Sequence, residues 1–159
     1  MINERDLGSE WYNRAVWVQN GHYLAALYFS RRHWFVGAFT VVVAAAVGTS
    51  VFATLAKQVD LLPLTGALSV VATLASALQT FLSYGERADK HRVAGARYGV
   101  VGRDLELLLS KPQFDSDALS MVKEKLDALA QECPHIPDAV HKKMERSPAK
   151  RLPFSQERG

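Results

Sequence analysis

Five histidines and one cysteine are the side chains of this sequence best suited to metal binding or to nucleophilic and acid–base chemistry. No two histidines stand four residues apart with a supporting acid, and one cysteine cannot complete the common zinc sites. Cys133 with His135 nearby is more typical of a structural residue than of a reactive thiol. The sequence has no phosphate-binding loop, dinucleotide-binding glycine pattern or nucleophile elbow. We therefore expect no enzyme, no catalytic residue, no metal and no cofactor.

Hydroxyl side chains recur at regular spacing in the apolar middle of the chain. Small residues at steps of four let helices approach closely in a bilayer, so helix packing is one interpretation. The other is a pore, in which several copies contribute hydroxyls that support water and ions without a fixed charge. Both interpretations stay open for the candidate residues, which are Thr49, Thr65, Ser69, Thr73, Ser76 and Thr80.

Two long uncharged runs carry these hydroxyls and set the class of the protein. Residues 34–56 and 61–84 contain no charged side chain. A bilayer core about 30 Å thick is crossed by roughly 20 apolar residues in a helix, so both runs are long enough. A simple soluble globule is excluded, and the single cysteine excludes an intrachain disulfide. The absence of charge within the runs speaks against a proton relay or a charged selectivity ring.

The short connection 57–60 predicts that the two spans form an antiparallel transmembrane hairpin. Pro63 fits the first turn of the second span, where its missing N–H costs nothing. Six basic residues flank the outer ends of the hairpin, against Lys57 alone in the connection. The positive-inside rule then predicts that both termini are cytoplasmic.

The flanks of the spans show heptad spacing, which predicts a cytoplasmic helical bundle. Residues 9–33, with Ser9 as helix cap, are expected to run without interruption into the first span. Residues 86–110 are expected to continue the second span in the same way. Two antiparallel helices would then bring their stripes together, with bundle contacts from Trp11, Val18, His22, His91 and Tyr98. For His22 and His91 a buried histidine and a pH-sensitive contact are both open.

A third amphipathic helix is expected at 115–132, capped by Asp115 or Ser116, and it can fold back onto the first two. Residues 133–159 form a basic C-terminal segment with a short helix expected at 138–146. This segment either lies against anionic lipid or is an exposed end. Basic and acidic residues alternate before it, so nucleic-acid binding is not expected.

The arrangement resembles the SLATT domains, two-transmembrane effector modules of bacterial conflict systems. In this chain an aromatic-rich helix with Trp11, Tyr12, Tyr23 and Tyr28 precedes the hairpin. The stretch 87–98 follows it with the pattern H-x-x-A-x-x-x-Y, formed by His91, Ala94 and Tyr98, and the sequence Asp104-Leu105-Glu106 comes next. The resemblance covers about residues 9–132 and carries over no ligand-binding residue.

The resemblance implies an oligomeric pore-forming effector that permeabilises the bacterial inner membrane. Its trigger would be a separate sensor protein or a nucleotide second messenger. Its partners would be the lipid bilayer and further copies of the chain. The fold expected is an all-α membrane protein. The alternative function is a non-conducting anchor or scaffold that recruits a partner through its cytoplasmic bundle.

Overall fold

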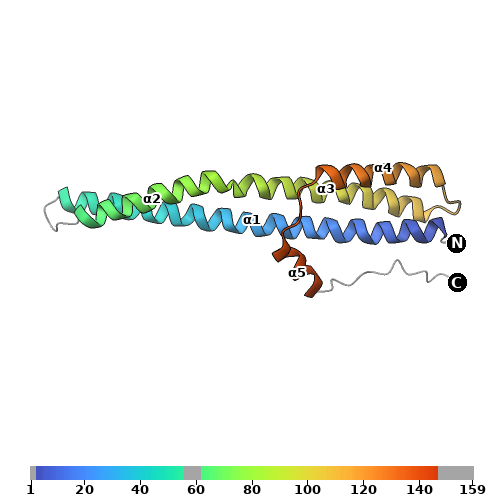
Figure 1. Cartoon of the computed structure of the whole chain (residues 1–159), viewed down its shortest axis with the longest axis horizontal. Helices are drawn as coiled ribbons and strands as arrows, with labels where there is room; N and C mark the ends of the chain where they lie inside the picture. The colour runs from blue at the N-terminus through green and yellow to red at the C-terminus, as the bar shows by residue number, and fades with distance from the viewer. Residues whose placement is uncertain (1–2, 56–61, 147–159) are drawn as a thin grey trace. The chain divides into compact units, whose positions relative to one another are not determined.

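The computed structural model describes residues 3–55 and 62–146. Helices account for nearly all of these ranges, and no strand occurs in them (Figure 1). The helices are α1 (Glu4–Leu55), α2 (Leu62–Leu82), α3 (Tyr84–Ser110), α4 (Ser116–Glu132) and α5 (Asp138–Arg146). The predicted connection 57–60, the span ends at 56 and 61, and the tail from 147 lie outside the described residues.

The chain divides into two compact units. The hairpin unit is Phe29–Arg87, and the bundle unit comprises the chain up to Tyr28 and from Ala88 onward. Two helical stretches, within Glu4–Val51 and within Pro63–Ser110, are long and apolar enough to cross a membrane. The fold is therefore the expected all-α arrangement with two apolar spans.

Helix α1 begins earlier than the sequence pattern predicts. Ser9 lies inside the helix, and Asn3 stands at its start. The backbone carbonyl of Asn3 accepts a hydrogen bond from the N–H of Leu7 at 3.0 Å, and its side-chain oxygen accepts one from the N–H of Arg5 at 3.3 Å. Asparagine is as good a helix cap as serine. Since Ser9 lies inside α1, the prediction that it caps this helix was wrong.

The sequence predicts that the second helix continues unbroken to Ser110, but the structure has a break in it. Ser83 separates α2 from α3 and has a φ of 43°, in the left-handed region. Its hydroxyl donates to the carbonyl of Thr80 at 3.0 Å, and its own carbonyl accepts from the N–H of Arg87 at 3.1 Å. A left-handed non-glycine residue costs roughly 1–2 kcal/mol and interrupts a helix without a proline. Because no proline lies between Pro63 and Pro112, the sequence does not reveal this break.

In the bundle unit, α3 and α4 pack with the first part of α1 around one apolar core. The stripe predicted on α3 is buried throughout, and Leu105 is fully buried. Helix α4 begins after its cap Asp115, whose side chain accepts a hydrogen bond from the N–H of Ala118 at 3.0 Å. The core consists of Tyr98, Val101, Leu105, Leu108, Leu119, Val122 and Leu129.

Helix α5 packs on α1 and lies apart from α4, on the other side of α1 (Figure 1). Val140 and Met144 are buried in a second, smaller cluster with Ala25. Gly21 of α1 lies where the α5 segment packs. A Cβ there would lie 2.7 Å from Ile136 Cδ1 and 3.0 Å from Met144 Sδ. Glycine therefore lets the α5 segment approach α1 closely.

Candidate functional site

In the hairpin unit, α1 and α2 run side by side and antiparallel (Figure 1). The Thr65 hydroxyl donates to the Ser50 hydroxyl at 2.7 Å. Further along, a Cβ on Gly37 would lie 3.7 Å from Gln79 Nε2. Half-buried residues of α2 recur at steps of three and four and define the strip that faces α1, namely Thr65, Leu68, Ala72, Ala75, Gln79 and Leu82.

A second stripe of α2 holds the hydroxyls and lies beside the strip that faces α1. Its members are separated by four, three and four residues, so a helix of 3.6 residues per turn keeps them on one flank. Ser69 is half-buried, whereas Thr73, Ser76 and Thr80 are exposed. We call Ser69, Thr73, Ser76 and Thr80 the hydroxyl flank.

The opposite flank of α2 is apolar. Val71, Leu74, Leu78 and Phe81 follow one another at steps of three, four and three, and their exposed fractions range from 41% to 83%. At 100° per residue, this flank and the hydroxyl flank lie on opposite sides of the strip that faces α1. The two exposed surfaces of one helix therefore differ sharply in polarity.

Three of the four hydroxyls on the hydroxyl flank donate to backbone carbonyls of α2 itself. Those of Ser69, Thr73 and Thr80 donate to the carbonyls of Thr65, Ser69 and Ser76, at 2.8, 2.9 and 3.1 Å. Each oxygen still has acceptor capacity for water or for a neighbouring helix. These three hydroxyls can therefore stay in lipid without an unsatisfied donor and can also line a hydrated path.

The other two candidate hydroxyls occupy different surroundings. Thr65 belongs to the contact with α1, which is the helix-packing role considered for it. Thr49 is exposed on α1, and its hydroxyl donates to the carbonyl of Ala45 at 2.9 Å. Sequence reasoning missed Ser50 and Gln79, although both fall on the strips where the helices meet.

In the bundle unit, the structure brings His22 of α1 and His91 of α3 together. Their side chains are 2% and 3% exposed, and the two Nδ1 atoms lie 2.9 Å apart. At this distance one Nδ1–H donates to the other, unprotonated Nδ1. The Tyr98 ring stacks on His22, with centroids 5.5 Å apart and an interplanar angle of 20°.

The surroundings of this pair favour its neutral state. Burial, and to a smaller extent the neighbouring His91, lower the pKa of His22 from 6.5 to about 4. Burial also lowers the pKa of His91. Because burial disfavours a charged imidazole at both positions, acid should weaken the contact between α1 and α3.

Two glycines allow α1 and α3 to approach beside the histidine pair. A Cβ on Gly95 would lie 3.1 Å from Tyr23 Cε1, and one on Gly99 would lie 2.8 Å from Gln19 Nε2. These glycines stand four residues apart, a spacing visible in the sequence but not used in predicting the bundle. The side chains of Tyr23 and Gln19 therefore pack directly against the backbone of α3 beside the histidine pair.

The remaining bundle candidates border one groove. Trp11, Val18 and Tyr98 line a groove of about 220 Å³ between α1, α3 and α4. Burial, with a smaller contribution from Cys133, raises the pKa of Tyr98, so its phenol stays protonated. Within the described residues no group of three or more metal-ligating side chains gathers.

This architecture, two apolar spans joined to a helical bundle, defines a helical membrane protein of the two-span class. Residues 6–143 match the family model described as SMODS and SLOG-associating 2TM effector domain family 4. The chain belongs to this SLATT family, which confirms the resemblance found from the sequence, and it is a membrane effector domain. Comparison with curated proteins and with solved structures finds no match.

Proposed function

We propose that this chain is a pore-forming effector that oligomerises in the bacterial inner membrane and permeabilises it. The observation that carries the proposal is the division of α2 into a hydroxyl flank and an apolar flank. An isolated hairpin surrounded by lipid gains nothing from placing its hydroxyls on one exposed side. Several copies with their hydroxyl flanks turned inward would enclose a polar path and leave Leu74 and Phe81 to the lipid.

The proposal places both termini in the cytoplasm and the bundle unit with them. Support comes from the excess of basic residues at the outer ends of the spans. Since α1 and α3 carry the bundle and also lead into the hairpin unit, a change in bundle packing can act on the spans. The family description names SMODS and SLOG as associated domains. We therefore propose that a separate sensor of that kind, or the nucleotide it handles, supplies the trigger.

Planar-bilayer conductance with matched variants tests the pore. Thr73→Val with Ser76→Ala removes two hydroxyls at nearly constant volume. Thr73→Ser with Ser76→Thr keeps both hydroxyls and the same total volume. We expect stepwise conductance for the unmodified chain and for the hydroxyl-retaining pair, and at least a tenfold loss for the hydroxyl-free pair.

Equal conductance from both pairs, at unchanged oligomeric state, would contradict the hydroxyl-lined pore. If the unmodified chain shows no conductance even with its sensor present, the pore function is replaced by the non-conducting anchor or scaffold function. In that case the hairpin should tolerate replacement by an unrelated hairpin without loss of function.

A further inference from the structure

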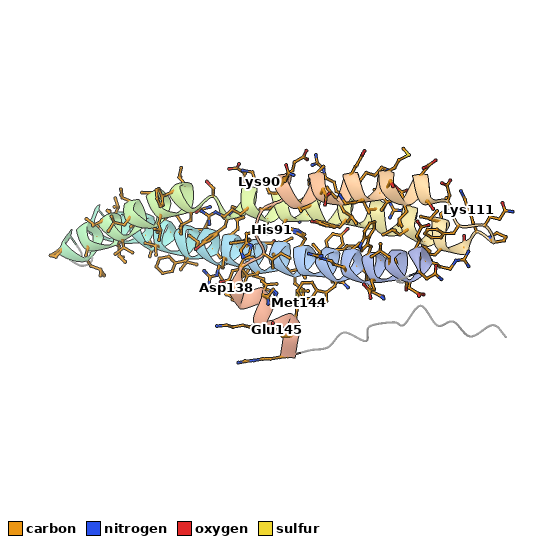
Figure 2. All side chains as sticks on the ribbon, turned by 45° about the vertical axis from the view of Figure 1, so that its right-hand side comes forward. Lys90, His91, Lys111, Asp138, Met144 and Glu145 are labelled. Carbon is orange, nitrogen blue, oxygen red and sulfur yellow. The ribbon has the colours of Figure 1, made fainter. Side chains whose placement is uncertain are left out.

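Helix α5 is fixed to α1 through one face only. Val140 and Met144 are 4% and 7% exposed and pack with Ala25, and Gly21 leaves the room that Ile136 and Met144 fill. Figure 2 shows Met144 on the side of α5 that is turned to α1. This cluster is separate from the main core of the bundle. The other residues of α5 are exposed to solvent.

The exposed surface of α5 is divided by charge. At 100° per residue, Lys143 and Arg146 fall on one side of the docked face, and Lys142 lies next to Arg146, directly opposite that face. Asp138, His141 and Glu145 fall on the other side. This acidic side has partners, because His141 Nδ1 lies 3.3 Å from a Glu145 carboxylate oxygen and its ring meets the Trp17 ring edge-on at 5.2 Å.

Among the described residues, the three cations of α5 have no counterion, unlike three cations of α3 and α4. Arg97 pairs with Glu132 at 2.8 Å, Lys125 with Asp104 at 2.7 Å and Lys123 with Asp127 at 2.8 Å. Within residues 3–55 and 62–146, no carboxylate lies within 4.0 Å of a Lys142, Lys143 or Arg146 nitrogen. These three unpaired cations, within five residues of one short helix, make this part of α5 a positive surface.

The seat of α5 on α1 lies close in sequence to the first uncharged run. Tyr28, which packs against the α5 cluster, precedes Trp34 at the start of the first uncharged run by six residues. Six residues reach at most about 21 Å, even when fully extended. Arg31 and Arg32 lie between them. Where basic residues reach the surface of an anionic membrane, each tightens binding about fivefold, and this attraction falls off within a Debye length of about 8 Å.

We propose that the Lys142–Lys143–Arg146 flank of α5 binds anionic phospholipid headgroups of the bilayer that holds the hairpin. The seat on α1 orients this flank, and the headgroups supply the missing negative charge. The proposal needs the membrane location of the chain but not the pore, so either can fail alone.

Hydrogen exchange of the full chain in lipid nanodiscs tests the proposal. One set of discs contains phosphatidylcholine only, a second contains about one third phosphatidylglycerol, and a third is phosphatidylcholine with inorganic phosphate in solution. A ligand that binds the folded helix slows exchange of its amides by the factor 1 + [L]/Kd. We expect amides of 138–146 to exchange at least tenfold more slowly in the phosphatidylglycerol discs than in the other two.

The triple variant Lys142→Gln, Lys143→Gln, Arg146→Gln should lose this slowing. A matched triple, Arg97→Gln, Lys123→Gln, Lys125→Gln, removes three paired cations and should keep it. Equal exchange in all discs, slowing by phosphate alone, or slowing that survives in the α5 triple would each overturn the proposal. Unchanged exchange of the triple in phosphatidylcholine discs shows that its docked face is intact.

Discussion

At the scale of single residues, the bundle unit contains two histidines that are buried as a neutral, hydrogen-bonded pair. The heptad pattern places His22 and His91 on the stripes of two helices, so their burial follows from the sequence. Their contact depends on the axial alignment of α1 and α3, which close packing at Gly95 and Gly99 helps to set. The spacing of residues in the sequence does not predict this alignment accurately enough to place two side chains within hydrogen-bond distance.

The histidine pair predicts that the protein loses stability in acid. The folded pKa of His22 is about 4, below its unfolded value of 6.5, so unfolding takes up a proton in this range. Stability is therefore complete above pH 6.5 and falls as the pH approaches 4, by up to about 3 kcal/mol for this group. The measurement is thermal unfolding of the detergent-solubilised protein between pH 8 and pH 4.

Substitution of His22 and His91 together by glutamine removes the titration and leaves groups able to form hydrogen bonds. We expect a flatter pH dependence of the unfolding temperature in this variant. His135→Gln, at an exposed position, is the control and should keep the original dependence. An unchanged dependence in the double variant would show that other groups cause the acid sensitivity.

At the scale of helices, the heptad stripes predicted the buried faces of α1, α3 and α4 well, because apolar periodicity reports burial directly. Breaks and starts were harder to predict. Ser83 has no strong turn preference, yet it separates α2 from α3 with a positive φ. A local backbone conformation of this kind depends on packing around it, which a single sequence does not contain.

Because Ser83 has a positive φ, we expect glycine to be preferred over alanine at position 83, between α2 and α3. Ser83→Gly and Ser83→Ala both remove the hydroxyl, but only glycine adopts a positive φ without a Cβ penalty. We expect Ser83→Gly to be more stable than Ser83→Ala by about 1 kcal/mol. Chemical unfolding of the two variants under the same conditions measures the difference. Greater stability of the alanine variant would show that Ser83 is helical in the protein.

Gly21 gives a second prediction at this scale, where helix propensity and packing have opposite signs. Alanine stabilises a helix interior by about 1 kcal/mol relative to glycine. At Gly21 the new Cβ would meet Ile136 and Met144, whereas at Gly102 it would meet nothing within 4 Å. We expect Gly102→Ala to stabilise the chain and Gly21→Ala to stabilise it less, because Ile136 and Met144 must shift to make room. Chemical unfolding of both variants measures the two effects, and an equal or larger gain from Gly21→Ala would contradict the close packing.

At the scale of the whole molecule, two uncharged runs and a charged remainder determine the class of protein. Length and charge alone predicted two spans, because a bilayer tolerates few alternatives. The sequence predicted less well which face of α2 contacts α1 and which faces are exposed. The sequence grouped Thr65 with Thr73, but only the position of α1 shows that Thr65 meets Ser50 while Thr73 faces outward.

The proposed topology can be tested with a single thiol, since Cys133 is the only cysteine. In a Cys133→Ser background, Ala128→Cys places a thiol at an exposed position of α4, and Gln58→Cys places one in the connection. A membrane-impermeant maleimide applied to intact spheroplasts should label the connection, and α4 only after lysis. The reverse pattern would place the termini outside.

The central claim is that the hydroxyl flank of α2 borders a water-filled path. In the Cys133→Ser background, Ser76→Cys places a thiol on that flank, and Leu74→Cys places one at nearly the same depth on the apolar flank. The decisive measurement is bilayer conductance before and after a water-soluble methanethiosulfonate reagent, which reaches only hydrated thiols. The account predicts that conductance through the Ser76→Cys channel falls sharply while that of Leu74→Cys persists. Block at Leu74→Cys with none at Ser76→Cys would contradict it.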